Sequence, residues 1–268
     1  MSKSFDHFGY MGGLMRSAKT YAAAIWVFVS LAVFSARAEA SDFREGFDSG
    51  NKFYEQGDYP AAIAEYEKAR LSGEVSAALY YNLAGAYLKS GDLGRAILNY
   101  QRAAIIAPRD PDIASNQSFA RSMVTGKEAQ RRGFFAWRPV RVYSRFFTTN
   151  EISLIASALF FMFFIALAAA AVYENMRARL LLLCAILAVG VTVNSAVIFH
   201  KVKLSGSYAV TVSPEADALF APFDSATKFF TLHEGNGVIV LETKSPWCRV
   251  RRSDGMVGWV KLSDIERI

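Results

Sequence analysis

The sequence has few of the residues that carry most metal and redox chemistry. Its 268 residues include two cysteines and three histidines. Cys184 lies inside an apolar run and Cys248 lies near the C-terminus, so we expect no internal disulfide. Beyond the first 38 residues the two histidines, His200 and His233, lie in separate segments, and no zinc-binding spacing joins them to a cysteine pair. We therefore predict no bound metal and no cofactor.

Catalytic motifs are absent as well. The chain contains neither a G-x-S-x-G elbow nor an H-E-x-x-H sequence. Residues 13–20, GLMRSAKT, come close to a phosphate-binding loop, but Ala18 stands where that loop needs glycine, and no strand precedes it. Acidic residues are scattered over predicted helix surfaces, where solvated charge is the ordinary explanation. We predict no catalytic residue and a protein that is not an enzyme.

Charge is also scarce. Charged residues make up 20% of the chain and hydrophobic residues 53%, which is too apolar for an ordinary soluble protein. The excess is concentrated in two uncharged runs, residues 152–172 and 180–199. At about 1.5 Å of rise per residue, each run covers the roughly 30 Å hydrocarbon core of a bilayer. We predict transmembrane helices at 151–173 and 180–200, joined into an antiparallel hairpin by a short connector at 174–179.

The N-terminal region predicts export. An apolar run from residue 21 follows Arg16 and Lys19 and ends at small residues that a signal peptidase reads, so residues 1–38 are interpreted as a cleaved signal peptide. An uncleaved anchor stays open as the alternative. Without residues 1–38 the net charge falls from +6 to +3, because 26 basic and 23 acidic residues remain. The basic composition is therefore no argument for a nucleic-acid partner.

The remaining basic charge is concentrated beside the first apolar run. Residues 127–150 alternate arginines with aromatic residues, which is typical of a segment at the surface of a lipid bilayer. Stacking of nucleic-acid bases is the weaker alternative, and we predict no nucleic acid. Cytoplasmic loops favour such positive charge, whereas a cleaved signal places the preceding domain outside. We expect a two-pass protein of the bacterial inner membrane with both soluble domains periplasmic; the opposite orientation stays open.

Residues 43–110 contain two sequence repeats with a period of 34 residues. The glycines that end the first helix of each unit fall on equivalent positions, and so do the small and the aromatic residues of the second helix. The equivalent pairs are Phe53 and Tyr87, Gly57 and Gly91, Asp58 and Asp92, Tyr59 and Leu93, Ala62 and Ala96, Tyr66 and Tyr100, and Ala69 and Ala103.

This pattern resembles the tetratricopeptide repeat family, in which each unit is a pair of antiparallel helices. We place repeats at 43–76 and 77–110, followed by a capping helix near 112–124, within a domain spanning 39–126. The resemblance implies a protein-binding groove on the first helix of each repeat. A clamp for a peptide C-terminus is disfavoured, because cations are lacking where such a clamp would need them. The implied groove residues are Arg44, Phe47, Asn51, Tyr54, Ala78, Tyr81, Asn82, Gly85 and Lys89.

Residues 204–268 change to short alternating strands, with a hairpin signal at Asp254 and Gly255. The segment of residues 230–260, from FTLHEG to GMVGWV, resembles the bacterial SH3-like family. This resemblance implies a small all-β barrel. Trp247 and Trp259 are either a ligand shelf or part of the barrel core. Cys248 is interpreted as a buried, unreactive thiol.

One strongly polar side chain, Asn194, lies inside the second apolar run. An intramembrane amide usually bonds to a neighbouring helix, either within the hairpin or in another protein. Because the run holds no ionisable group, proton or ion conduction is not predicted.

The predicted fold class is a multidomain membrane protein: an all-α tetratricopeptide solenoid, a transmembrane helical hairpin and a small all-β SH3-like barrel. This order of modules resembles the BatE-like proteins of bacterial aerotolerance (Bat) operons. That resemblance implies a scaffold in envelope or oxidative stress whose partners are von Willebrand type A membrane proteins linked to a MoxR-type ATPase. A peptidoglycan-binding tether and a regulatory subunit of an envelope enzyme remain alternatives.

Overall fold

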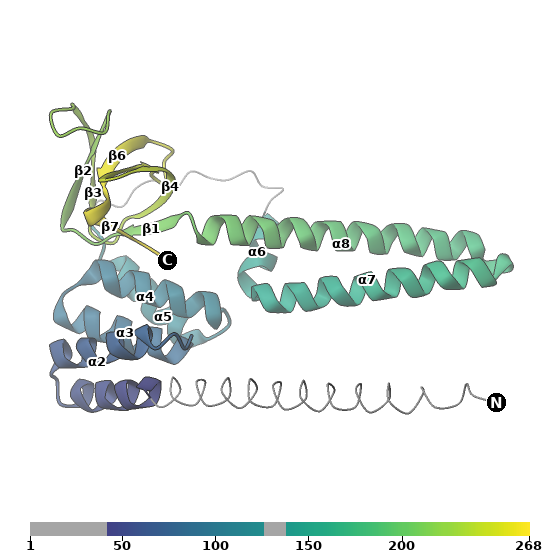
Figure 1. Cartoon of the computed structure of the whole chain (residues 1–268), viewed down its shortest axis with the longest axis horizontal. Helices are drawn as coiled ribbons and strands as arrows, with labels where there is room; N and C mark the ends of the chain where they lie inside the picture. Colours follow the sequence, from purple (N-terminus) through teal and green to yellow (C-terminus); the bar gives the residue numbers. More distant parts are fainter. Residues whose placement is uncertain (1–41, 126–137) are drawn as a thin grey trace, which may run out of the picture. The chain divides into compact units, whose positions relative to one another are not determined.

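The computed structural model describes residues 42–125 and 138–268 (Figure 1). The predicted signal peptide and residues 127–137 of the juxtamembrane segment lie outside the described residues. The chain divides into two compact units, residues 1–75 and 76–268. The predicted fold class is confirmed, because helical repeats, two long apolar helices and an all-β C-terminal part follow one another along the chain.

The described residues of the first unit form one helical pair. Residues 42–55 are helical, and α2 (Tyr59–Leu71) follows after a turn at Gly57, whose φ of 78° is the left-handed conformation that glycine adopts without strain. The Asp58 side chain accepts a hydrogen bond from the backbone N–H of Ala61 and caps α2. Tyr66 and the small Ala62 are buried between the two helices.

The second unit begins with the equivalent pair, α3 (Ala77–Ser90) and α4 (Leu93–Ile106), followed by α5 (Pro111–Ser122). Gly91 has a φ of 91°, and the Asp92 side chain accepts from the backbone N–H of Arg95, so the turn and the cap recur 34 residues later. The α4 helix ends before Pro108, and Pro111 begins α5, which packs against α4 where the sequence places a capping helix.

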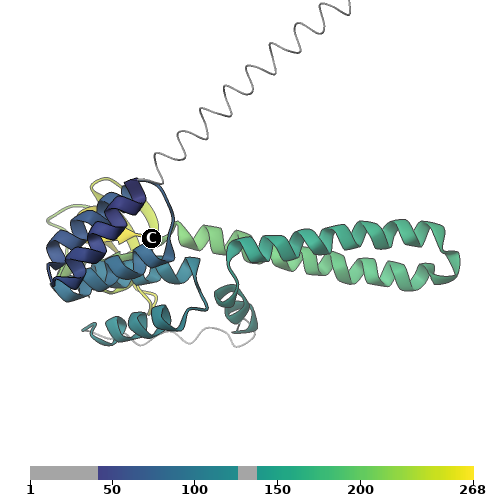
Figure 2. The same ribbon diagram turned by 90° about the horizontal axis from the view of Figure 1, so that it is seen from below.

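Two long helices follow the short α6 (Arg138–Phe146). A reciprocal pair of hydrogen bonds between Thr148 and Glu151 begins α7 (Thr149–Val172), and the turn η2 (Glu174–Met176) leads into α8 (Arg177–Ser205). The two helices run antiparallel, side by side, in both views (Figures 1 and 2). Their contact buries Ala166, Cys184 and Leu187.

Both helices are long and apolar enough to cross a membrane. Only 11% and 22% of their most apolar windows are buried inside the molecule, whereas the core helix of a soluble protein is mostly buried. The outward faces carry large apolar side chains such as Phe161 and Leu182, which are more than half exposed. Such a surface favours contact with lipid over contact with water.

The C-terminal residues form seven strands, which we call the sheet domain (residues 208–268). The strands pair in the order β3-β2-β6-β5-β4-β1-β7, and each neighbouring pair is antiparallel. Among the described residues no pairing joins the outer strands β3 and β7, so the sheet is open where the sequence predicts a barrel. The strands are β1 (Tyr208–Thr211), β2 (Glu215–Leu219), β3 (Lys228–His233), β4 (Gly237–Lys244), β5 (Trp247–Arg251), β6 (Val257–Lys261) and β7 (Ile265–Arg267).

The sheet domain has its own apolar core. Alternate residues of the strands point into it, including Leu232, Val238, Val250 and Val260. Cys248 is part of this core and fully buried, and burial raises the pKa of its thiol to about 11. This is the environment that the sequence predicts for an unreactive thiol.

Candidate protein-binding groove

The first-unit half of the predicted groove lies on the helix of residues 42–55. Arg44 is exposed, and Phe47, Asn51 and Tyr54 are half-buried. The Phe47 ring lies 6.0 Å from the ring of Tyr66, measured between centroids. The Tyr66 hydroxyl donates a 2.7 Å hydrogen bond to the Asn51 side-chain oxygen. Packing inside the repeat therefore positions this amide.

The second-unit half lies on α3. Tyr81, Asn82 and Gly85 are half-buried and Lys89 is exposed. The Tyr81 ring meets the ring of Tyr100 edge-on at 5.8 Å between centroids. Tyr81 and Tyr100 lie one 34-residue period after Phe47 and Tyr66, so the same aromatic contact is repeated in the second unit. The same aromatic support thus stands behind the first-helix face of each repeat.

The capping helix α5 contributes to this face in a way that the sequence does not reveal. The Asn116 side-chain nitrogen donates a 2.8 Å hydrogen bond to the Tyr81 hydroxyl. Burial raises the pKa of Tyr81, and the nearby carboxylates of Asp112 and Asp110 raise it further. The field at Tyr81 is therefore negative, which opposes the binding of a peptide C-terminal carboxylate and agrees with the absence of a cationic clamp. Phe119, also on α5, is an exposed aromatic side chain.

The structure describes the two halves separately, since Arg44 to Tyr54 belong to the first unit and Tyr81 to Lys89 to the second. The groove that would join them stays a prediction. Each half by itself offers a face with half-buried aromatic and amide side chains at its centre and one exposed cation, Arg44 or Lys89. Aromatic and amide side chains of this kind are suited to polypeptide contact, so each face is a candidate site for a protein partner.

The proposed tryptophan shelf of the sheet domain is mostly covered. Trp247 is 7% exposed and Trp259 is 9% exposed, and both pack against Leu219. Lys261 lies over the Trp247 ring at 5.5 Å and Lys244 over the Trp259 ring at 5.4 Å. This geometry favours the packing alternative, because a ligand would have to displace both lysines. The role of the two indoles as a shelf remains an untested prediction.

Asn194 has its partners within its own chain. The hydroxyl of Tyr143, on α6, donates a 2.7 Å hydrogen bond to the Asn194 side-chain oxygen, and the amide nitrogen donates to the Gly190 carbonyl at 2.8 Å. Asn194 is 8% exposed. The bond ties α6 to the apolar helix α8, so this amide need not bind a second protein.

We predict that this bond contributes about 1 kcal/mol to the stability of the hairpin. Tyr143→Phe and Asn194→Ala should each destabilise α6 and α8, and the double variant should cost less than the sum, which a double-mutant cycle of unfolding in detergent measures. Thr192→Val supplies the control, because the Thr192 hydroxyl bonds to Ala188 in its own helix. Additive effects of Tyr143→Phe with Asn194→Ala would show that the bond is not formed.

A metal site has no support in the described part of the chain, where no group of three or more His, Cys, Asp or Glu side chains is placed to hold an ion. The comparison with family models points instead to binding. Residues 47–111 match the tetratricopeptide repeat family model. None of the curated proteins compared with the chain matches it. Tetratricopeptide repeats typically bind protein partners and carry no catalysis, so the matched region indicates protein–protein interaction.

Proposed function

We propose that this protein is a non-enzymatic scaffold of the bacterial inner membrane. The tetratricopeptide groove recruits a protein partner, and the α7–α8 hairpin holds the complex at the bilayer. The observation that carries the proposal is the repeated aromatic support of the groove, Phe47 on Tyr66 and Tyr81 on Tyr100, in a chain that also exposes two long apolar helices.

The charges on the α3 face limit the kinds of polypeptide that can bind there. Asp110 and Asp112 lie near Tyr81 and Lys89 is exposed at the other end of α3, so the face suits a neutral or mixed-charge helix or extended segment. A carboxylate-ended peptide fits it poorly. The resemblance to BatE-like proteins makes von Willebrand type A membrane proteins the first partners to test. The predicted signal peptide supports a periplasmic location for both soluble domains.

A peptidoglycan tether has less support. It would use the sheet domain as the gripping module, but the two indoles that suggested a shelf are covered by lysines and packed against Leu219. A regulatory role beside an envelope enzyme is compatible with the groove, since such a subunit also works through protein contact.

We expect a photo-crosslinking amino acid at Lys89 to trap a membrane protein of the envelope in living cells. The matched control is the same amino acid at Ile105, which is 43% exposed but lies on α4, the second helix of the same repeat. Mass spectrometry should identify a partner from Lys89 that Ile105 does not yield. Equal trapping at both positions, or no protein trapped at Lys89, would count against a partner in the groove.

A further inference from the structure

The sheet domain packs against the outer side of the second repeat. Val210, in β1, is fully buried in one apolar cluster with Ile97 and Leu98 of α4. Tyr208 and the C-terminal Ile268 pack against the same cluster. A surface that buries strand and helix residues together is a continuous core, whereas a chance contact between surfaces leaves its side chains half-exposed.

The backbones approach closely at a glycine. A Cβ atom added to Gly94, in the first turn of α4, would lie 2.6 Å from the carbonyl oxygen of Thr211 and 2.9 Å from the Cα atom of Val212. These distances are shorter than van der Waals contact allows. No side chain other than hydrogen fits at residue 94 while β1 stays in place.

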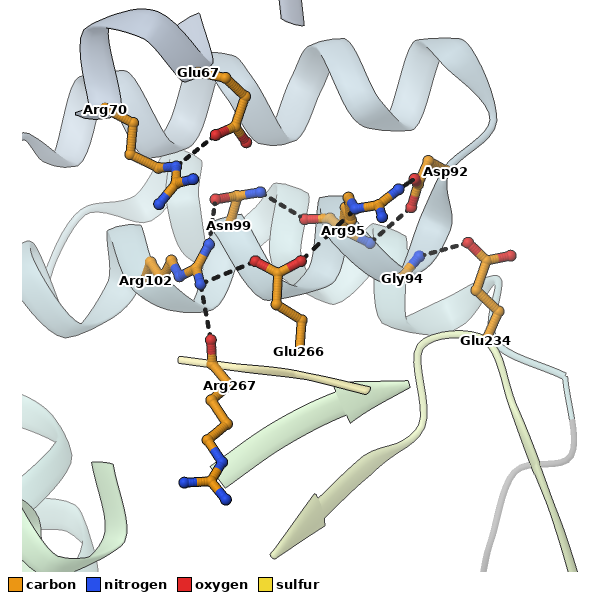
Figure 3. A network of polar contacts seen from close by, with 10 residues as sticks. All are labelled: Glu67, Arg70, Asp92, Gly94, Arg95, Asn99, Arg102, Glu234, Glu266 and Arg267. Carbon is orange, nitrogen blue, oxygen red and sulfur yellow. Dashed lines mark hydrogen bonds and ion pairs between the residues drawn. The ribbon is translucent and has the colours of Figure 1, made fainter. Parts of the chain in front are cut away.

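Charged groups complete the contact (Figure 3). The Glu234 carboxylate accepts a 2.7 Å hydrogen bond from the backbone N–H of Gly94, at the positive end of α4. Arg102 donates to the Glu266 carboxylate at 3.1 Å and to the Arg267 carbonyl at 2.8 Å. The Arg102 side chain is 14% exposed and the Glu266 side chain 37% exposed, so water screens this pair in part.

The first repeat serves as an internal comparison, because it has no such features at the equivalent positions. Subtracting 34 from 94 and 98 gives Pro60 and Ala64, and both are exposed, whereas Gly94 and Leu98 are buried. The repeat pattern thus departs at the residues that touch the sheet domain. Folding of the repeat alone does not require either departure.

We infer that the sheet domain is a binding module whose ligand is α4 of its own chain. It occupies the second-helix side of repeat two, while the partner face lies on α3 of that repeat. Because β1 begins directly after α8, docking joins the second repeat and the membrane hairpin through the sheet domain as well as through the α5–α6 segment. The sheet domain then fixes the second repeat relative to the hairpin. Its docking surface consists of strands β1 and β7 and the turn that contains Glu234.

Gly94→Ala tests the close approach in the full-length protein in detergent. Alanine favours a helix over glycine, so α4 itself should form at least as well. We expect hydrogen exchange of the β1 and β7 amides to accelerate by roughly tenfold or more, because the added methyl group displaces the strand. Gly206→Ala is the control, since its Cβ would meet no atom within 4 Å. Unchanged exchange in Gly94→Ala would overturn the inference.

A charge exchange tests the same surface without adding bulk. Arg102→Glu and Glu266→Arg should each raise exchange in both α4 and β7, and the double variant should restore part of the protection. Rescue is partial because Arg95, which also pairs with Glu266 at 3.7 Å, would face an arginine at residue 266. Fluorescence of the buried Trp247 and Trp259 should stay constant throughout, which shows that the sheet domain remains folded. Single variants without effect, or a double variant no better than the worse single one, would show that the docked arrangement is not maintained by these groups.

Discussion

Replacing Tyr100 with alanine is expected to lower the free energy of unfolding of the second repeat by about 3–5 kcal/mol. Tyr100 is 3% exposed and its ring supports Tyr81 on the groove face. Removing the ring leaves a cavity beneath that face, so partner binding should fall together with stability. The free energy is measured as hydrogen-exchange protection of α3 and α4 in the full chain.

Tyr173→Ala is the matched control for this experiment. Tyr173 lies in the turn that connects α7 to α8 and is 58% exposed. Its replacement should therefore change the stability of the second repeat by less than about 0.5 kcal/mol. A similarly small effect of Tyr100→Ala would contradict the structure, because it would mean that the aromatic core of the repeat carries little of its stability.

Maleimide labelling of Cys184 should test whether α8 lies in the bilayer, and labelling of Cys248 should test whether the sheet domain is folded. In native membranes neither Cys184 nor Cys248 should react with a water-soluble maleimide, since both are buried. After urea unfolds the soluble domains, Cys248 should become fully labelled while Cys184 stays unlabelled, because a thiol in hydrocarbon stays out of reach. The readout is the mass shift of each single-cysteine variant.

The raised pKa of Cys248 makes the stability of the folded sheet domain depend on pH. Burial raises that pKa from 9.0 to about 11, so folding favours the neutral thiol. The stabilisation is fully present below about pH 9 and is lost as pH rises toward 11. We expect Cys248 in the folded protein to be labelled at pH 8 at least ~100-fold more slowly than in the unfolded protein.

Labelling of Cys184 in urea-treated membranes would show that α8 does not lie in the bilayer.

The repeats and the long helices follow from local properties of the chain. A 34-residue register places the turn glycine, the capping aspartate and the buried alanine of each repeat, because every one of these acts on neighbours within a few turns. Two uncharged runs of about 20 residues likewise predict helix length without reference to the rest of the molecule. Signals of this kind specify a helical pair or a long apolar helix without any tertiary contact.

The details of the candidate site were less accessible from the sequence. The hydrogen bond from Asn116 to Tyr81 depends on how α5 packs against α4, which no local pattern indicates. Trp247 and Trp259 lie in predicted strands, and nothing in the strand pattern indicates that two lysines cover their rings. The partner of Asn194 lies 51 residues away in the chain, so no periodicity points to it.

The sequence by itself determined the order of the modules and the helical character of the first ones, because turn glycines, caps and apolar runs act over short stretches of chain. The closure of the C-terminal strands was not determined in this way, since the predicted barrel is an open sheet. Only the tertiary structure decided what those modules do to each other within the second unit. Leu98, Gly94 and Arg102 look like ordinary helix residues until β1 and β7 lie against them. The reason is that burial and ion pairing depend on groups brought together from more than a hundred residues apart, and that information is absent from any local pattern.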